Sequence, residues 1–208
     1  MMAGLPLDTA SLLAIAAALG WASGLRLYAV VFLTGIAGFL GWVDLPSGLK
    51  LLQSPLMLGA SGLMLVVEFF ADKIPGIDTL WDLIHTVVRI PAGAALAAAV
   101  FGADQSSWAM AAALMGGTLA ATSHVAKATT RAALNTSPEP FSNLAMSLLG
   151  DSVVPASLWL SWAHPTVFFA ALAVAVVLMI VLIWVLVKFL RGLARRVSAL
   201  FATARPSA

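Results

Sequence analysis

The sequence contains no cysteine, which excludes thiol catalysis, disulfide bonds and thiolate metal ligands. Charged side chains make up only 10% of its 208 residues, whereas about a quarter of the residues of a soluble domain carry charge. Hydrophobic residues account for 62% of the chain. A water-soluble chain of this length cannot bury so much apolar surface, so lipid must solvate part of it.

Common catalytic motifs are also missing. The chain has no Gly-x-Ser-x-Gly elbow, no His-Glu-x-x-His and no phosphate-binding loop, and no loop is long enough to hold a soluble domain. The net charge of +2 does not indicate a nucleic-acid partner, because five of the eleven Lys and Arg residues follow residue 187. We therefore favour a non-catalytic protein and expect no nucleic-acid partner.

Long apolar runs recur along the chain and predict an all-α, polytopic membrane helix bundle of about six spans. The clearest run, 166–187, has 22 uncharged residues, enough at a rise of about 1.5 Å per residue to cross a hydrocarbon core of roughly 30 Å. The third helix must begin near Asp78, since too few residues separate Arg89 from Asp104 to span. We predict one transmembrane domain over 1–190.

The first apolar run, 9–43, is too long for one upright span. As a single helix it would measure about 50 Å. It must tilt strongly, extend beyond the bilayer or break, and Ser23-Gly24 is the natural position for a break. Its single charge, Arg26, follows directly.

The distribution of cations predicts the orientation, because cytoplasmic loops carry an excess of Lys and Arg. With six spans and a cytoplasmic C-terminus, only Lys50 lies outside and Arg26 lies in the membrane. Nine cations are then cytoplasmic: Lys73, Arg89, Lys127, Arg131, Lys188, Arg191, Arg195, Arg196 and Arg205. The prediction is that both termini are cytoplasmic.

The two halves of the chain, about 9–103 and 105–187, share a pattern. Ser54-Pro55 followed by Glu68 matches Ser137-Pro138 followed by Asp151 at the same offset of 83 residues. With three spans in each half, this predicts an inverted 3+3 repeat, a recurring transporter design with its site near mid-membrane. The alternative is coincidence in a chain rich in Ala, Leu and Gly.

Arg26 and Asp151 both lie near the middle of apolar runs. An ionised group at that depth is costly, so each must be paired, hydrated or protonated. Pairing Arg26 with Asp151 would neutralise both. The functional interpretation is a gate, a proton-binding carboxylate or an ion site, and the alternative is a structural pair that aligns the helices.

The densest polar segment supplies six candidate site residues: Glu68, Asp72, Asp78, Asp82, His85 and Arg89. The last four follow at i, i+4, i+7 and i+11, a single helical stripe, and the turn at Pro75-Gly76 should bring it against the first two. Oxygen and imidazole ligands suit a divalent cation, with Glu68, Asp72, Asp82 and His85 as candidate ligands. The alternative is a salt-bridged hairpin at the membrane surface, in which Arg89, Lys73 and His85 balance the carboxylates.

Two further basic segments indicate anionic partners. His124, Lys127 and Arg131 form a cationic stripe suited to an anionic solute or a lipid phosphate, although such cations also serve only to set topology. The segment 188–208 is predicted to be a basic amphipathic helix on the anionic cytoplasmic leaflet.

Two stretches resemble a known family. They are Ala22-Ser23-Gly24-Leu25-Arg26-Leu27-Tyr28 and Glu68-x-x-x-Asp72-Lys73-Ile74-Pro75-Gly76-Ile77-Asp78 with Asp82-Leu83-Ile84-His85-Thr86. Over most of 10–190 the chain resembles a bacterial membrane family catalogued as domain of unknown function 4126. The resemblance implies a multi-span protein of the bacterial inner membrane and singles out these polar residues as a family signature.

Three functions from different classes remain open. Buried charges, a broken first helix and the repeat favour transport of a small solute or ion, with cation or proton coupling. A non-catalytic membrane assembly or scaffold protein is the second, and a metal-dependent enzyme acting on a lipid is the third. We also expect a homo-oligomer, because so small a bundle needs a second copy to enclose a path.

Overall fold

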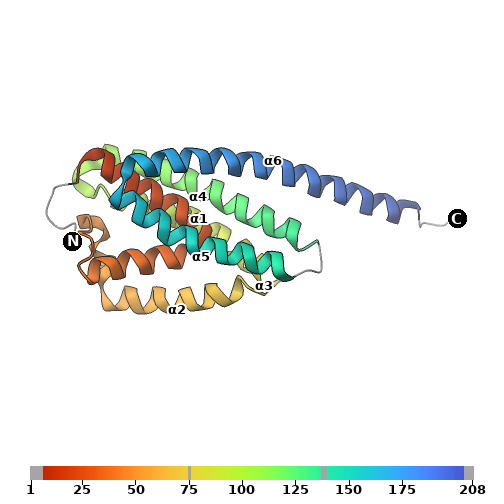
Figure 1. Ribbon diagram of the computed structural model, residues 1–208, viewed down its shortest axis with the longest axis horizontal. Coiled ribbons are helices and arrows are strands. Elements are labelled where there is room, and N and C mark those ends of the chain that lie inside the picture. The colour runs from red at the N-terminus through yellow and green to blue at the C-terminus, as the bar shows by residue number, and fades with distance from the viewer. Residues whose placement is uncertain (1–6, 75, 137–139, 204–208) are drawn as a thin grey trace.

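The computed structural model describes residues 7–74, 76–136 and 140–203, which form an all-α bundle (Figure 1). No strand occurs in this part of the chain. The elements are α1 (Thr9–Phe39), η1 (Ser47–Gln53), α2 (Pro55–Ala71), α3 (Ile77–Ala99), η2 (Ala103–Gln105), α4 (Ser106–Leu134), α5 (Pro140–Ala163) and α6 (Pro165–Thr203). The predicted fold class is therefore confirmed.

The helices are long and apolar enough for a membrane. Five of them qualify by length and composition, and η1 with α2 makes a sixth if this pair, bent by 69°, is one span. Large apolar side chains such as Val174, Leu178 and Trp184 are exposed along α6. Only lipid solvates such a surface without cost, so the chain is a polytopic membrane protein.

The first helix is broken as predicted, but at Arg26, two residues after Gly24; the φ of −149° and ψ of 87° at Arg26 are not helical. Residues 9–25 run parallel to α4, since Gly20 lies against Gly116 and Gly24 against Ala120. Residues 27–39 run antiparallel to α2, because the later Gly35 faces Leu52 and Leu58 near the start of α2 while the earlier Phe32 faces Gly62.

These contacts mean that α1 folds back on itself. Both α2 and α4 run antiparallel to α3, as the pairs Glu68 with Arg89 and Gly93 with Ala120 indicate, so α2 and α4 are parallel to each other. The two arms of α1 consequently point in opposite directions. The first arm has 17 residues, about 25 Å of helix, and its tip at Arg26 lies deep in the bundle.

Close approach to α4 explains the glycines of the first arm. A Cβ on Gly20 would lie 2.4 Å from Gly116 Cα, and one on Gly24 would lie 2.2 Å from the Ala120 carbonyl oxygen. Such small-residue contacts allow helix backbones to approach within a membrane. The arm begins at Asp8, which caps it by accepting a hydrogen bond from Ser11 N at 2.8 Å, and hydrogen bonds from Ser11 lower the pKa of the Asp8 carboxyl.

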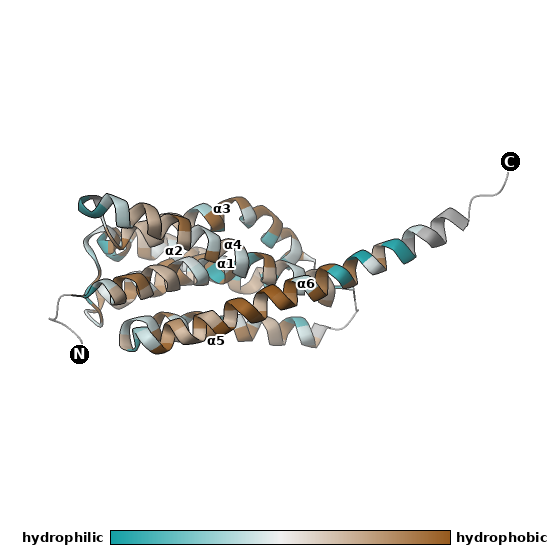
Figure 2. Ribbon diagram, turned by 90° about the horizontal axis from the view of Figure 1, so that it is seen from above, coloured by the Kyte–Doolittle hydropathy of each residue, from teal (hydrophilic) through white to brown (hydrophobic). Residues whose placement is uncertain are grey.

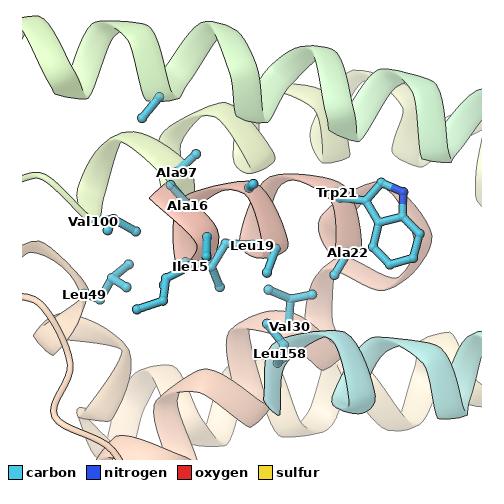
Figure 3. Packing of buried hydrophobic residues seen from close by; sticks show 14 of the residues in the cluster. Ile15, Ala16, Leu19, Trp21, Ala22, Val30, Leu49, Ala97, Val100 and Leu158 are labelled. Atoms are coloured by element: carbon cyan, nitrogen blue, oxygen red, sulfur yellow. The ribbon is translucent and has the colours of Figure 1, made fainter. Parts of the chain in front are cut away.

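The apolar core forms around this first arm. Residues 14–19 are fully buried, and Figure 3 shows Leu19 and Ala22 close to Val30 of the second arm and Leu158 of α5. A helix buried on all sides is central to its bundle. The hairpin is therefore the element around which the other helices pack.

The prediction that both termini are cytoplasmic is not confirmed. Because α1 returns to the end at which it enters, the helices α2 to α6 pass along the bundle five times. The start of α1 and the end of α6 lie at opposite ends of the molecule (Figure 1). If the bundle crosses the bilayer along its length, these two helix ends lie on opposite sides of it.

The inverted repeat is not confirmed. Its first half begins with a helical hairpin, α1, whereas its second half begins with a continuous helix of 29 residues, α4. The first arm of α1 also runs parallel to α4, while inverted copies would be antiparallel. Ser137-Pro138, half of the sequence match, lies outside the described residues.

The basic tail continues α6 without a break. The helix runs past Lys188 to Thr203, and its last part projects beyond the other helices (Figure 1). Its hydrophilic residues lie in this projecting part (Figure 2). The predicted helical tail is formed as far as the description reaches, while Arg205 lies outside it.

Candidate functional site

Ten charged side chains meet inside the bundle, and we call them the ion network. They come from α1, the C-terminal end of α2 and the residues after it, α3, α4 and α5. The cations are Arg26, Lys73, Arg89, Lys127 and Arg131, and the carboxylates are Glu68, Asp72, Asp78, Asp82 and Asp151. With five of each sign, the network is neutral as a whole, which lowers the cost of burying charge.

Arg26, at the tip of the hairpin, joins α1 to α2 and α5. Its Nη1 lies 3.1 Å from Asp72 Oδ2 and its Nη2 lies 3.0 Å from Asp151 Oδ1. Nη2 also donates to Ser147 Oγ at 2.9 Å. Asp151 is further paired with Lys73 Nζ at 3.1 Å. The predicted pair between Arg26 and Asp151 is confirmed.

Asp72 contacts three cations, as Asp82 also does. Besides Arg26, Asp72 binds Lys127 Nζ and Arg131 Nη1, each at 2.9 Å. Lys127 Nζ also donates to the carbonyl oxygen of Leu25 at 2.9 Å. That carbonyl is freed by the break in α1, so the same lysine satisfies the broken backbone and the buried acid.

Arg89 joins α3 to α2. Its Nη2 lies 2.7 Å from Glu68 Oε1 and its Nη1 lies 2.7 Å from Asp82 Oδ1, and all three side chains are buried. Lys127 Nζ lies 3.2 Å from the same Asp82 oxygen. The predicted stripe on α3 is confirmed, because Asp78, Asp82, His85 and Arg89 all face the interior.

Asp78 is held by amides more than by charge. It accepts hydrogen bonds from Asn135 Nδ2 at 3.1 Å, Asn143 Nδ2 at 2.9 Å and Gly76 N at 2.9 Å, whereas Arg131 Nη1 lies 3.8 Å away. These contacts tie the start of α3 to α4 and α5. The arrangement fits a structural role better than ion binding.

Sequence reasoning missed Asn143 and Ser147, which are buried and contact the ion network. A signal was present, because Asn143, Ser147 and Asp151 are spaced four residues apart in an otherwise apolar run. Polar residues at this spacing share one face of a helix. The face of α5 that meets the network is therefore readable in the sequence.

The two buried histidines hold neighbouring side chains. His85 stacks on Trp81 with ring centroids 4.0 Å apart, and its Nδ1 donates to the Trp81 carbonyl at 2.8 Å. Its Nε2 lies 3.2 Å from the Tyr28 hydroxyl. His124 Nε2 lies 2.8 Å from Thr86 Oγ1. Both rings are thus engaged away from the carboxylates.

The structure does not assemble the predicted metal site. No three His, Cys, Asp or Glu side chains in the described ranges are grouped to hold a metal ion. Of the predicted ligands, Glu68, Asp72 and Asp82 are drawn to cations and His85 to aromatic side chains. In the described structure these four side chains contact cations and aromatic rings.

The alternative, a salt-bridged hairpin at the membrane surface, holds only for Arg89, which pairs with Asp82 and Glu68. Lys73 pairs with Asp151 of α5, and the buried Asp72 is balanced by cations of α1 and α4 instead of by its neighbours. His124, Lys127 and Arg131 are not free at a surface, since the two cations bind Asp72. The cluster is an interior network between helices far apart in the sequence.

A few polar atoms of the network lack partners. Within the described residues, Glu68 Oε2, Asp82 Oδ2 and Arg89 Nε are buried without a hydrogen bond. Buried polar atoms are nearly always satisfied, so such atoms indicate a place for a proton or water. The other oxygen of Glu68, Oε1, accepts a hydrogen bond from Arg89 Nη2 at 2.7 Å.

Both stretches behind the sequence resemblance, 22–28 and 68–86, lie in or beside this network, so the signature and the site coincide. No curated protein and no solved structure matches the chain. The family model described as a domain of unknown function (DUF4126) matches residues 13–186, and the chain belongs to this family.

Proposed function

We propose that this protein transports a small solute or ion across the bacterial inner membrane, with the ion network as its central site. One observation carries the proposal. A helical hairpin enters the bundle from one end and holds Arg26 at its tip against Asp72 and Asp151 of two other helices.

Broken helices inside a membrane are expensive and occur where backbone is buried in protein or lines a cavity. In transporters, discontinuous helices form the substrate and ion sites. Here Ser123 Oγ donates to the Trp21 carbonyl and Lys127 Nζ to the Leu25 carbonyl, so α4 supports the break. A pair of charges that only aligned two helices would not require this folded-back segment.

Proton coupling fits the charge balance of the network. With five cations and five carboxylates, a further ion binds only if a partner is displaced or a carboxylate is protonated. Glu68 is fully buried and has one oxygen without a partner. Protonation of Glu68 would weaken its ion pair with Arg89, so that Arg89 would be held mainly by its other partner, Asp82.

The basic end of the bundle faces the cytoplasm in this proposal. Lys188, Arg191, Arg195 and Arg196 lie on the projecting part of α6, and cations favour the cytoplasmic side. The N-terminus then lies outside. The tail is placed to contact anionic lipids of the inner leaflet.

Proton flux into liposomes tests the mechanism. The purified protein is reconstituted with a trapped pH-sensitive dye, and the decay of an imposed pH gradient is followed. We expect wild type to accelerate the decay over empty liposomes, and Glu68→Gln and Asp151→Asn to slow it at least tenfold. The control is Asp44→Asn, an exposed carboxylate outside the network. Flux that both network variants leave unchanged would exclude this mechanism.

The alternative is a non-catalytic membrane assembly protein, and one observation favours it. Every carboxylate of the ion network has a cation or amide partner, as in a purely structural network. Reconstituted protein that moves no protons while Glu68→Gln and Asp151→Asn only lower stability would support this function instead. No comparable observation favours a metal-dependent lipid enzyme.

A further inference from the structure

A cavity of about 380 Å³ lies beside the ion network, between α1, α4, α5 and α6. Small-molecule sites have volumes of about 300–1,000 Å³. Its charged lining consists of Arg26, Asp72, Lys127 and Arg131, while the other four carboxylates of the network do not line it. Three cations and one carboxylate therefore line the cavity, and these cations also pair with Asp151, Asp78 and Asp82, which do not line it.

Arg26 Nη1, at this cavity, is ion-paired but not hydrogen-bonded to the described residues. It is buried and lies 3.1 Å from Asp72 Oδ2. Arg26 Nη2, in contrast, donates to both the carbonyl oxygen and Oγ of Ser147. An anionic oxygen that displaces Asp72 from Arg26 would form a charge-assisted hydrogen bond with the guanidinium group.

The rest of the wall is apolar and reaches the outside of the bundle. Leu149 of α5 and Leu178 and Leu182 of α6 line the cavity, and all three are exposed on the bundle surface. The cavity therefore opens sideways toward the bilayer between α5 and α6. Contact with such a wall is favourable for an alkyl chain and unfavourable for a hydrated ion, which would lose water there.

We infer that this cavity binds a single-chain amphiphile with an anionic head group, either a phosphate or a carboxylate. The head group accepts hydrogen bonds from Arg26, Lys127 and Arg131, and the alkyl chain lies against Leu178 and Leu182. The inference names the solute class of the proposed transport. That the amphiphile is transported rests on the proposed function. That it binds in the cavity does not depend on that function.

Gly150 allows the head-group end to be filled. A Cβ there would lie 3.5 Å from Arg26 Nε, an ordinary contact, so Gly150→Leu adds a side chain inside the cavity without moving backbone. Gly59 of α2 is the matched control, because a Cβ there meets nothing within 4 Å. Leu178→Trp, at an exposed position, narrows the end of the cavity that holds the alkyl chain. It replaces Gly150→Leu as the test variant if Gly150→Leu folds poorly.

The protein in neutral detergent is titrated with dodecyl phosphate, dodecanoate, dodecanol and inorganic phosphate, and the thermal unfolding midpoint and Kd are measured. A ligand of the folded state raises the midpoint. We expect the two anionic amphiphiles to raise it for wild type and Gly59→Leu, and dodecanol and inorganic phosphate to leave it unchanged. Gly150→Leu and Leu178→Trp should weaken binding at least tenfold.

Three results would overturn the inference: dodecanol as effective as dodecyl phosphate, inorganic phosphate as effective, or full affinity in both cavity variants. The proposed transport function is tested by a separate result. If dodecanoate binds as expected but enters proteoliposomes no faster than empty liposomes, the site stands and the transport function falls. If protons are moved through Glu68 but no amphiphile binds, the function stands and this inference falls.

Discussion

At the scale of single residues, buried charges in this bundle are stabilised because one side chain pairs with several of opposite charge. Asp72 receives three cations from α1 and α4, and Arg89 serves two carboxylates of α2 and α3. Removing one member of a buried pair leaves its partner charged and unpaired, which costs more than the pair itself contributes. The network should therefore be more sensitive to single substitutions than to balanced double ones.

Arg89→Met tests this directly, because Arg89 is the cation that Glu68 contacts among the described residues. We expect the free energy of unfolding in mixed micelles to fall by about 3–5 kcal/mol. Adding Glu68→Gln should recover part of the loss, since no unpaired charge then remains at that position. Lys50→Met, at an exposed cation, is the control. A loss below about 1 kcal/mol for Arg89→Met would show that water or a proton satisfies Glu68 without it.

At the scale of elements, the hairpin of α1 depends on backbone contact with α4. Gly20 and Gly116 face each other where any side chain would clash, and Ser123 and Lys127 bind the carbonyls near the break. Packing and hydrogen bonding thus act on the same pair of helices. The position of Arg26 at the hairpin tip therefore depends on the contact between the first arm of α1 and α4.

Gly20→Ala should disturb the contact, because its Cβ would lie 2.4 Å from Gly116 Cα. Overpacking of this kind costs about 1–3 kcal/mol, and we expect that loss in the free energy of unfolding. Gly59→Ala is the matched change on α2, where the added methyl group meets nothing. It should stabilise by up to about 1 kcal/mol through helix propensity. Equal effects of the two changes would argue against tight packing of α1 on α4.

At the scale of the whole molecule, the folded-back α1 sets the topology. Five passes by α2 to α6 separate the two ends of the chain, and a straight α1 would bring both ends to one side. Residue 8 caps the start of α1 and residue 44 follows the end of its second arm, so both lie at the end of the bundle opposite the α6 tail. The hairpin therefore predicts that these two positions share one side of the membrane.

Single introduced cysteines can report on which side of the membrane these positions lie. The chain has no native cysteine that would be labelled as well. We expect a membrane-impermeant maleimide to label Asp8→Cys and Asp44→Cys in intact cells, and Ser198→Cys only after lysis. Labelling of residues 8 and 44 on opposite sides would contradict the hairpin. Labelling of Ser198→Cys alone in intact cells would keep the hairpin and reverse the proposed orientation.

Much of this architecture was readable in the sequence for local reasons. The length of an apolar run and the cost of a charge within it predicted the helical segments, the break near Gly24, the pairing of Arg26 with Asp151 and the inward stripe on α3. Each depends on residues within one helix or on a charge that must find an opposite one.

Only the tertiary structure decided the direction of the chain after Arg26 and the choice of partners. The same 31 residues suit a straight helix or a hairpin, and the close contact of Gly20 with Gly116 is a property of α4 as much as of α1. Likewise, Asp72 had cations nearer in sequence than Arg26 and Lys127. Which charges meet depends on helix direction and register across the whole bundle, and composition and spacing within single segments do not contain that information.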